Sequence, residues 1–134
     1  MKLQEFLMKN GVQTEVQTEV HIKPFPEPFI IKSITEAENK AIRKSCEKTE
    51  FNKKTRQKET VMDRDLYANR LVVACCVDPN FKDAEFQKKF GVVGAEKLLD
   101  KILTPGQFAE LFEKVQELLG FDTDINDLIE EAKN

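Results

Sequence analysis

In the first part of the chain the apolar residues are first spaced as in a helix and then alternate with polar residues, as in a strand. A short amphipathic helix is predicted over residues 3–9, ended by Gly11, from three apolar residues on one face: Leu3, Phe6 and Leu7. The following segment, VQTEVQTEV, places Val and Thr on one parity and Gln and Glu on the other. Its three valines, four residues apart, could also share one face of a helix. The β-branched side chains favour a strand over residues 12–22, because they lose χ1 freedom in helices.

Three alternating prolines follow this strand, at positions 24, 26 and 28. Prolines at that density are excluded from a helix interior and from a central strand, so the segment forms a turn or an extended loop. Phe29–Ser33 is predicted to be a second short strand. We expect the two strands to pair as a hairpin across the PFPEP segment.

From residue 35 onwards the apolar positions follow helical spacing, and caps, glycines and prolines mark the helix ends. Thr35 and Glu38 form a capping-box pattern. The segment TPGQ at 104–107 combines a cap, a proline at the first helical position and a Gln three residues after the cap. The predicted helices run from Thr35 to about Cys46, Asp63 to Asp78, Asp83 to Gly91, Gly94 to Leu103, Thr104 to Gly120, and from Asp124 onwards.

These patterns predict a mainly α fold with a small N-terminal β-hairpin, an α+β protein whose compact body has about five to six short helices. A length of 134 residues indicates one domain over 1–134. Residues 1–34 would hold the N-terminal helix and hairpin, and residues 35–134 the helical body. Within that body residues 48–60 are predicted to be an exposed, mobile, basic loop, because Phe51 is their only bulky apolar residue.

Composition excludes some classes of function. Apolar residues make up 40% of the chain, charged residues 34%, and the formal net charge is −3. This balance excludes a globally basic nucleic-acid binder and predicts no strong attraction to anionic membranes. The chain has no run of about 18 apolar residues, and its start lacks the apolar stretch of a secretory signal. We expect a soluble cytoplasmic protein without a membrane partner.

Charge is unevenly distributed along the chain. Residues 40–58 contain eight basic and two acidic residues, a net charge of +6, whereas residues 105–134 contain eight acidic and two basic residues, a net charge of −6. These segments are either solvated surfaces that face each other or contacts for partners. Four residues are candidate contacts for an acidic partner: Lys53, Lys54, Arg56 and Lys58. Nucleic acid is a weaker alternative, because only one aromatic residue interrupts the basic segment.

No motif for catalysis or metal binding emerges from the residues. The three cysteines show no disulfide or metal spacing, and we expect them to be reduced and in the core. The segment at 122–126 begins like a calcium loop, but Asp127 and Lys133 stand where Gly and Glu are needed. A catalytic pair would have to use His21, and no local signature places a serine or cysteine beside it. We therefore expect no enzymatic activity, metal or cofactor.

A series of short segments between residues 29 and 134 stands out by its order and spacing: SITEAEN (33–39), KSC (44–46), VDPNF (77–81), DAE (83–85), FGVVGAEKLL (90–99), LTPGQ (103–107), VQELLGFD (115–122) and EEAKN (130–134). Together these segments resemble the XkdN-like tail assembly chaperones of long-tailed phages. The doubled VQTE unit and the three prolines depart from the family pattern, and this departure concerns the N-terminal hairpin only.

This resemblance implies a phage or prophage protein that acts in the host cytoplasm, is needed to build the tail, and is absent from the finished particle. The implied partner is the tape-measure protein, a very long helical chain, with the tail-tube subunit as a second candidate. Such chaperones are often made in a short form and a frameshifted longer form, and this chain would be the short one.

A chaperone of this kind would cover apolar stripes on its partner by packing helices into grooves. The candidate contact surface consists of five apolar residues: Phe86, Phe90, Phe108, Leu111 and Phe112. The alternative is that these residues are ordinary core, since a small protein with ten phenylalanines must bury most of them.

Overall fold

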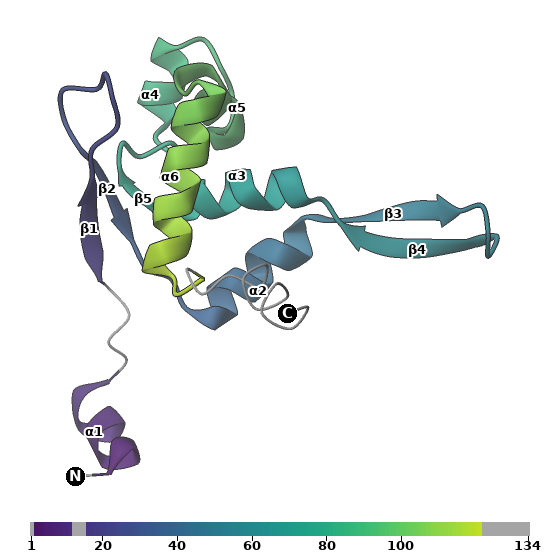
Figure 1. The fold of residues 1–134 in the computed structure, drawn as a ribbon, viewed down its shortest axis with the longest axis horizontal. Coiled ribbons are helices and arrows are strands. Elements are labelled where there is room, and N and C mark those ends of the chain that lie inside the picture. The colour runs from purple at the N-terminus through teal and green to yellow at the C-terminus, as the bar shows by residue number, and fades with distance from the viewer. Residues whose placement is uncertain (1, 12–15, 122–134) are drawn as a thin grey trace, which may run out of the picture.

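The computed structural model describes residues 2–11 and 16–121. Within them the chain forms six helices and five strands, arranged as a helical body from which one hairpin projects (Figure 1). The helices are α1 (Leu3–Asn10), α2 (Glu36–Ser45), α3 (Arg64–Cys75), α4 (Ala84–Lys89), α5 (Ala95–Ile102) and α6 (Pro105–Leu118). The strands are β1 (Gln17–Val20), β2 (Phe29–Lys32), β3 (Glu47–Asn52), β4 (Gln57–Met62) and β5 (Cys76–Asp78). The prediction of an α+β fold dominated by helices is confirmed.

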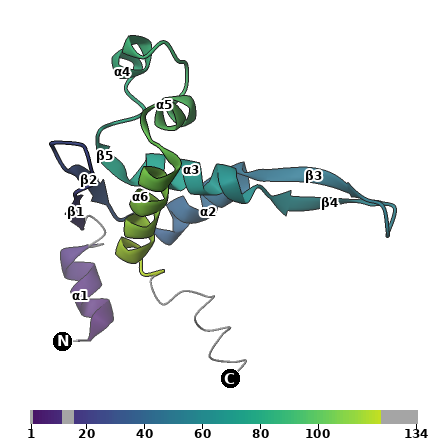
Figure 2. The same cartoon turned by 45° about the horizontal axis from the view of Figure 1, so that its top comes forward.

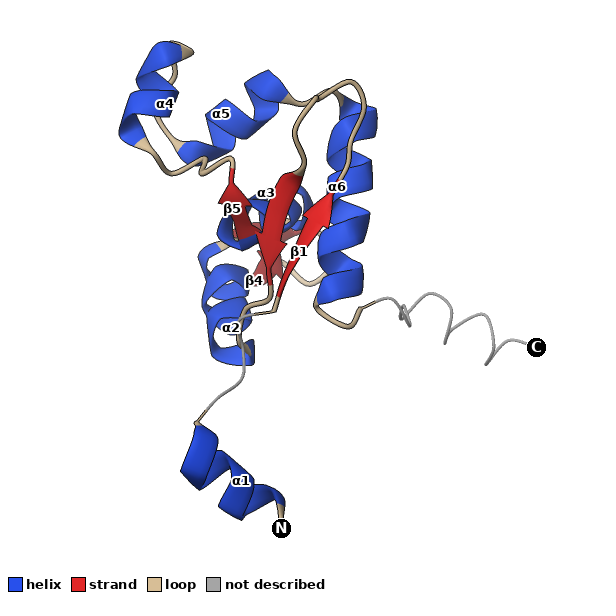
Figure 3. Cartoon of the chain, turned by 90° about the vertical axis from the view of Figure 1, so that its left-hand side faces the viewer, coloured by secondary structure: helices blue, strands red, loops and turns tan. Residues whose placement is uncertain are grey.

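A small antiparallel sheet with strand order β1-β2-β5 supports the helices. In β2, Phe29 and Ile31 are buried while the residues that alternate with them are half-buried, as expected for a strand with one inner face. Val20 lies opposite Phe29 and Cys76 opposite Ile31, so each outer strand adds a buried residue. Figure 3 shows α3 behind this sheet and α6 along its β1 side.

One hydrophobic core lies between the sheet and helices α3, α5 and α6. Leu71, Leu98 and Leu111, one from each helix, are completely buried. Removal of such side chains from water is the main favourable contribution to folding. The core comprises Val20, Ile22, Phe29, Ile31, Leu71, Val72, Val73, Cys75, Cys76, Phe81, Leu98, Leu99, Leu103, Leu111 and Val115.

Hydrogen bonds at the helix starts confirm the predicted capping residues, although at α2 the Glu38 side chain accepts from the Thr35 hydroxyl and not from its backbone amide, so the predicted capping box there is only half formed. Side-chain oxygens of Thr35, Asp63 and Asp83 accept from backbone amides in the first turns of α2, α3 and α4. At α6 the capping box is complete, because the Thr104 hydroxyl accepts from the Gln107 amide and the Gln107 side chain accepts from the Thr104 amide. These bonds satisfy amides that have no partner within the helix.

The prediction that residues 48–60 form a loop is wrong, although these residues are largely exposed as predicted. This segment belongs to an antiparallel hairpin, β3–β4, in which Glu47 lies opposite Met62 and Asn52 opposite Gln57. Neither face of the hairpin packs on the core, so its sequence lacks the apolar alternation that would predict strands. The hairpin projects away from the other elements in both Figure 1 and Figure 2.

The helix predicted from Asp63 to Asp78 is too long. Helix α3 ends at Cys75, and β5 follows it and pairs with β2. Strands β1 and β2 pair antiparallel on either side of the PFPEP segment, as the predicted hairpin requires, and β5 extends them to a three-stranded sheet that the sequence did not predict. Residues 12–15 of the first predicted strand, the calcium-like segment and the last predicted helix lie outside the described residues. No helix in the described part is long and apolar enough to span a bilayer.

Candidate partner-binding surfaces

Helix α1 exposes its apolar side chains. None of its residues is buried, and its four large apolar residues are between 41% and 79% exposed: Leu3, Phe6, Leu7 and Met8. Figure 1 shows α1 apart from the other helices. A helix of eight residues is too short to be stable alone in water. Its apolar face is therefore a candidate contact for a partner. The spacing predicted this helix but not this role.

The hairpin at residues 47–62, hereafter the arm, has a turn that Asn52 organises. Asn52 Oδ1 accepts from the amides of Lys54 at 2.9 Å and Thr55 at 3.3 Å, and its Nδ2 donates to Glu59 Oε1 at 2.6 Å. Arg56 adopts a left-handed conformation with φ of 58°, and its amide donates to the Asn52 carbonyl at 2.7 Å. The arm therefore ends in a defined turn.

Residues 51–58, hereafter the tip, bring the predicted basic contacts together at the end of the arm. All four are exposed: Lys53, Lys54, Arg56 and Lys58. The tip contains no acidic residue, so its formal charge is +4. Phe51 lies directly opposite Lys58 and is 62% exposed. The tip thus offers four cations and one aromatic ring.

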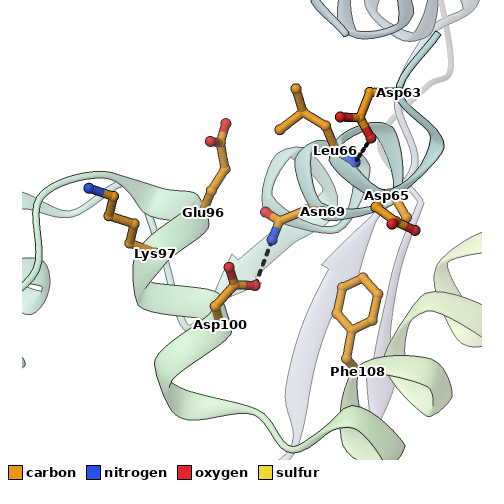
Figure 4. A pocket seen from close by; sticks show the side chains of 9 residues that line it. Asp63, Asp65, Leu66, Asn69, Glu96, Lys97, Asp100 and Phe108 are labelled. Atoms are coloured by element: carbon orange, nitrogen blue, oxygen red, sulfur yellow. Dashed lines mark hydrogen bonds between the residues drawn. The ribbon is translucent and has the colours of Figure 1, made fainter.

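At the base of the arm the first turns of α3 border an open groove of about 550 Å³, hereafter the acidic groove. Figure 4 shows residues of α5 on the opposite side and Phe108 of α6 at one end. Phe108 and Leu66 supply apolar surface. The charged residues of the lining are four carboxylates and one ammonium group: Asp63, Asp65, Glu96, Asp100 and Lys97. The sequence did not predict this groove, because its carboxylates come from the start of α3 and from α5, some thirty residues apart along the chain.

Three of the four carboxylates accept hydrogen bonds within the chain. Glu96 Oε1 accepts from Arg70 Nε at 2.6 Å, and Asp100 Oδ1 accepts from Asn69 Nδ2 at 2.9 Å. The third carboxylate, Asp63, caps α3. The Asn69 Oδ1 atom is buried and has no hydrogen-bond partner among the described residues. Asp65 is exposed. Among the described residues only Glu96 of these four carboxylates is paired with a cation at close range, so the groove keeps a net negative charge.

The five apolar residues predicted as a contact surface fall into two groups. Phe108 and Phe112 stack on α6 with ring centroids 6.0 Å apart, and Phe86 and Phe90 pack edge to face at 5.4 Å. Between these two groups the described residues show no ring contact. Phe90 is 40% exposed, whereas Leu111 is completely buried and belongs to the core.

The thiols and His21 offer no reactive pair within residues 2–11 and 16–121. All three cysteines are free and buried, as predicted: Cys46, Cys75 and Cys76. Burial raises the pKa of Cys75 to about 11 and that of Cys76 to about 12, so neither is a thiolate near neutral pH. His21 is exposed, and its Nε2 lies 3.8 Å from Glu19 Oε2. The same residues contain no cluster of three or more His, Cys, Asp or Glu that could hold a metal ion.

The sequence matches a known family over nearly its whole length. The family described as phage XkdN-like tail assembly chaperone protein matches residues 3–133. The chain belongs to this family. Membership confirms the resemblance and assigns the chain to the phage tail assembly chaperones, which act on other tail proteins. The chaperone's candidate sites are therefore the surfaces that can contact a protein.

Two relatives of this chaperone come from Bacillus subtilis strain 168. Uncharacterized protein YqbN is 33% identical over 108 residues, which cover 79% of this chain and 71% of YqbN. Phage-like element PBSX protein XkdN is 29% identical over 108 residues, which cover 79% of this chain and 72% of XkdN. The crystal structure of YqbN has a TM-score of 0.68 to this fold at 22% identity, covering 91% of this chain and 98% of that one. The chaperone therefore shares the fold of YqbN.

Proposed function

We propose that this chaperone binds the tape-measure protein and keeps it soluble during tail assembly in the host cytoplasm, without catalysing a reaction and without remaining in the finished particle. A long amphipathic helix that awaits its tube subunits exposes apolar stripes, and such stripes aggregate unless they are covered. The observation that carries this proposal is the apolar face of α1, which the described part of its own chain leaves exposed.

Helix α1 has the spacing needed to lie along such a stripe. Leu3, Phe6 and Leu7 occupy positions i, i+3 and i+4, the pattern by which an amphipathic helix docks on an apolar groove. Full burial of each side chain contributes roughly 1.5–3 kcal/mol. Three such residues give a weak contact, and several chaperone copies along a long partner would add to it.

Two further apolar surfaces extend this proposal. The first lies on α4 and the turn after it, where Phe86 packs on Phe90 and the nearby Val93 is 85% exposed. The second is the stacked pair Phe108 and Phe112 on α6, which is half-buried. In the proposed function these surfaces serve the tape measure or, as further partners, the tail-tube subunit and a frameshifted longer form of the chain.

Co-expression with the tape-measure protein of the same gene cluster tests the proposal. The tape measure is expected to be insoluble alone, and soluble and co-eluting in size exclusion when this chain is present. A tape measure that is equally soluble alone and never co-elutes contradicts the proposal.

Paired variants of α1 locate the contact. Leu7→Lys and Glu5→Lys each add one lysine to the same helix, but only the first places it in the face formed by Leu3, Phe6 and Leu7. Leu7→Lys is expected to abolish co-elution, whereas Glu5→Lys retains it. Phe90→Glu and Phe112→Glu test the other two surfaces in the same assay. Circular dichroism of each variant shows whether the body remains folded.

A further inference from the structure

The arm is a two-stranded sheet without a covering layer. Most of its residues are exposed, and only Asn52, Val61 and Met62 are half-buried. An isolated two-stranded hairpin is at best marginally stable in water, and its free edges invite pairing. The hydrogen bonds of Asn52 nevertheless give it a defined turn. Such an arm is suited to contact a second molecule.

The tip and the acidic groove are complementary in charge and in apolar surface. The tip carries four cations, no acidic residue and the exposed ring of Phe51. The groove carries four carboxylates against one ammonium group, with Leu66 and Phe108 as its apolar part. Surfaces of opposite charge attract each other before contact and fix the orientation of docking.

The tip cannot reach the groove of its own chain. Asp63 and Asp65 of the groove follow β4 directly, so the groove lies at the base of the arm. The tip lies at the other end of two six-residue strands, which is a distance of about 20 Å at about 3.3 Å per residue. The complementary surfaces therefore lie at opposite ends of one arm.

We propose that two copies of this chain associate by exchanging arms, so that each tip lies in the acidic groove of the other copy. When two arms run antiparallel about a two-fold axis, each tip arrives at the base of the other arm. Such a contact is the same in both directions and closes as a dimer. The lysines and Arg56 then meet the carboxylates, and Phe51 packs on Leu66 and Phe108.

This association goes beyond the proposed function. Helix α1, which carries that function, takes no part in the association, whereas Phe108 belongs to surfaces used in both proposals. The attraction acts between exposed groups, so salt should weaken it. The Debye length falls from about 10 Å at 0.1 M salt to about 3 Å at 1 M. We expect the dissociation constant of the dimer to rise at least about tenfold between about 0.05 M and about 0.5 M salt.

Charge reversal followed by mixing tests the exchange. The tip variant Lys53→Glu with Lys54→Glu and the groove variant Asp65→Lys with Asp100→Lys are each expected to be monomeric in analytical ultracentrifugation at low salt. An equimolar mixture of the two is expected to form dimers, because the carboxylates introduced into one tip then meet the lysines introduced into the other copy's groove, and the unaltered tip meets the unaltered groove. A variant with all four changes is expected to form dimers by itself.

A matched control reverses two lysines at a distance from the arm. Lys88→Glu with Lys89→Glu changes the net charge as the tip variant does, but on α4, and is expected to leave the dimer intact. A wild-type chain that stays monomeric at low salt overturns the proposal, as do dimers that survive both reversals. If the monomer binds a DNA duplex through the tip instead, the basic residues serve nucleic acid and the proposal is likewise overturned.

Discussion

Arg70 donates through Nε to Glu96 Oε1 at 2.6 Å, a contact that joins the middle of α3 to the start of α5. Its Nη1 also donates to the carbonyl and the hydroxyl of Ser45, at 2.8 and 2.9 Å, where α2 ends. The hydrogen bond with Glu96 raises the pKa of the Arg70 guanidinium. One side chain thus connects three helices at the base of the arm, beside the acidic groove.

Replacing Arg70 by Met is expected to lower the free energy of unfolding by about 1–2 kcal/mol. The change removes hydrogen bonds from a charged donor, and partial exposure of the pair reduces their contribution. Arg70→Lys keeps the charge but not the planar fork, so it should recover less than half of the loss. Urea unfolding followed by circular dichroism measures both variants. A loss confined to a few tenths of a kcal/mol for Arg70→Met would show that the helices are held elsewhere.

Leu111 and Phe90 separate core from surface among the predicted contact residues. Leu111 is completely buried, so Leu111→Ala should lower the free energy of unfolding by about 2–5 kcal/mol. Phe90 is 40% exposed and packs mainly on Phe86, so Phe90→Ala should lower it by about 1 kcal/mol. Urea unfolding curves measure both values. Equal losses would contradict the division of these residues into core and surface.

The helices could be predicted because their signals are local. Asp83 and Thr104 each lie within three residues of the amides they cap, so a short stretch of sequence contains both partners of the bond. Glycine ends are equally local, since the positive φ of 71° at Gly91 suits a residue without a side chain. The buried residues of α5 and α6 could be predicted from helical spacing alone.

The arm and β5 could not be predicted in the same way. A strand exposed on both faces has no apolar alternation, and the one local signal of the arm is Asn52 before a basic turn. Strand β5 follows α3 without a break, in the apolar run LVVACCV, whose residues suit a helix or a strand equally. Its pairing with β2 is a tertiary contact that spans more than forty residues.

The candidate surfaces were predictable only in their composition. The basic residues of the tip were identified from charge, but the hairpin that gathers Lys53 and Lys58 at one end was not. The acidic groove depends on the packing of α3 against α5, which no local pattern specifies. Phe90 and Phe112 were predicted to belong to one contact surface, and the structure places their rings in separate pairs.

Gln107 is expected to contribute to stability through both ends of its amide. Its Oε1 completes the capping box, and its Nε2 donates to the Lys23 carbonyl at 3.0 Å, which ties α6 to the loop between β1 and β2. Gln107→Glu keeps the acceptor and loses the donor, and Gln107→Ala loses both. We expect losses of about 1 kcal/mol for the first and about 2 kcal/mol for the second. Thermal unfolding shows which variant loses more stability. A larger loss for Gln107→Glu than for Gln107→Ala would contradict this role.

Stability is expected to fall above pH 9 because two thiols are buried. Burial raises the pKa of Cys75 to about 11 and of Cys76 to about 12, from an ordinary value of 9.0. Above pH 9 the unfolded chain loses these protons while the folded chain keeps them, so alkali favours unfolding. Each thiol lowers the free energy of unfolding by up to about 1.4 kcal/mol per pH unit, until the pH reaches its folded-state pKa.

The double variant Cys75→Ala with Cys76→Ala isolates this effect. Burial also raises the pKa of Tyr67, which acts in the same direction and is present in both proteins. The double variant should be less stable at pH 7, because it leaves cavities, but its stability should decline less steeply between pH 9 and 11. Urea unfolding at each pH gives the free energy of unfolding of the two proteins. If this free energy declines equally steeply with pH in both, the thiols are excluded as the cause.

The arm is expected to be dispensable for the fold of the body. Glu47 and Met62 face each other at its base, and the Asp63 amide donates to the Cys46 carbonyl at 2.8 Å beyond them. Replacing residues 48–61 by Asn-Gly joins this pair through a two-residue hairpin loop. Because the removed residues are largely exposed, the midpoint of thermal unfolding should change by less than about 5 °C.

The shortened chain also separates the functions proposed for different surfaces. It keeps α1 and should therefore co-elute with the tape-measure protein as the full chain does. It lacks the tip and should be monomeric at low salt, although its acidic groove remains and can still receive the arm of a full-length copy. A mixture of short and full chains should then form weak heterodimers through one contact in place of two. A shortened chain that aggregates or loses its helical circular dichroism would show instead that the arm completes the body.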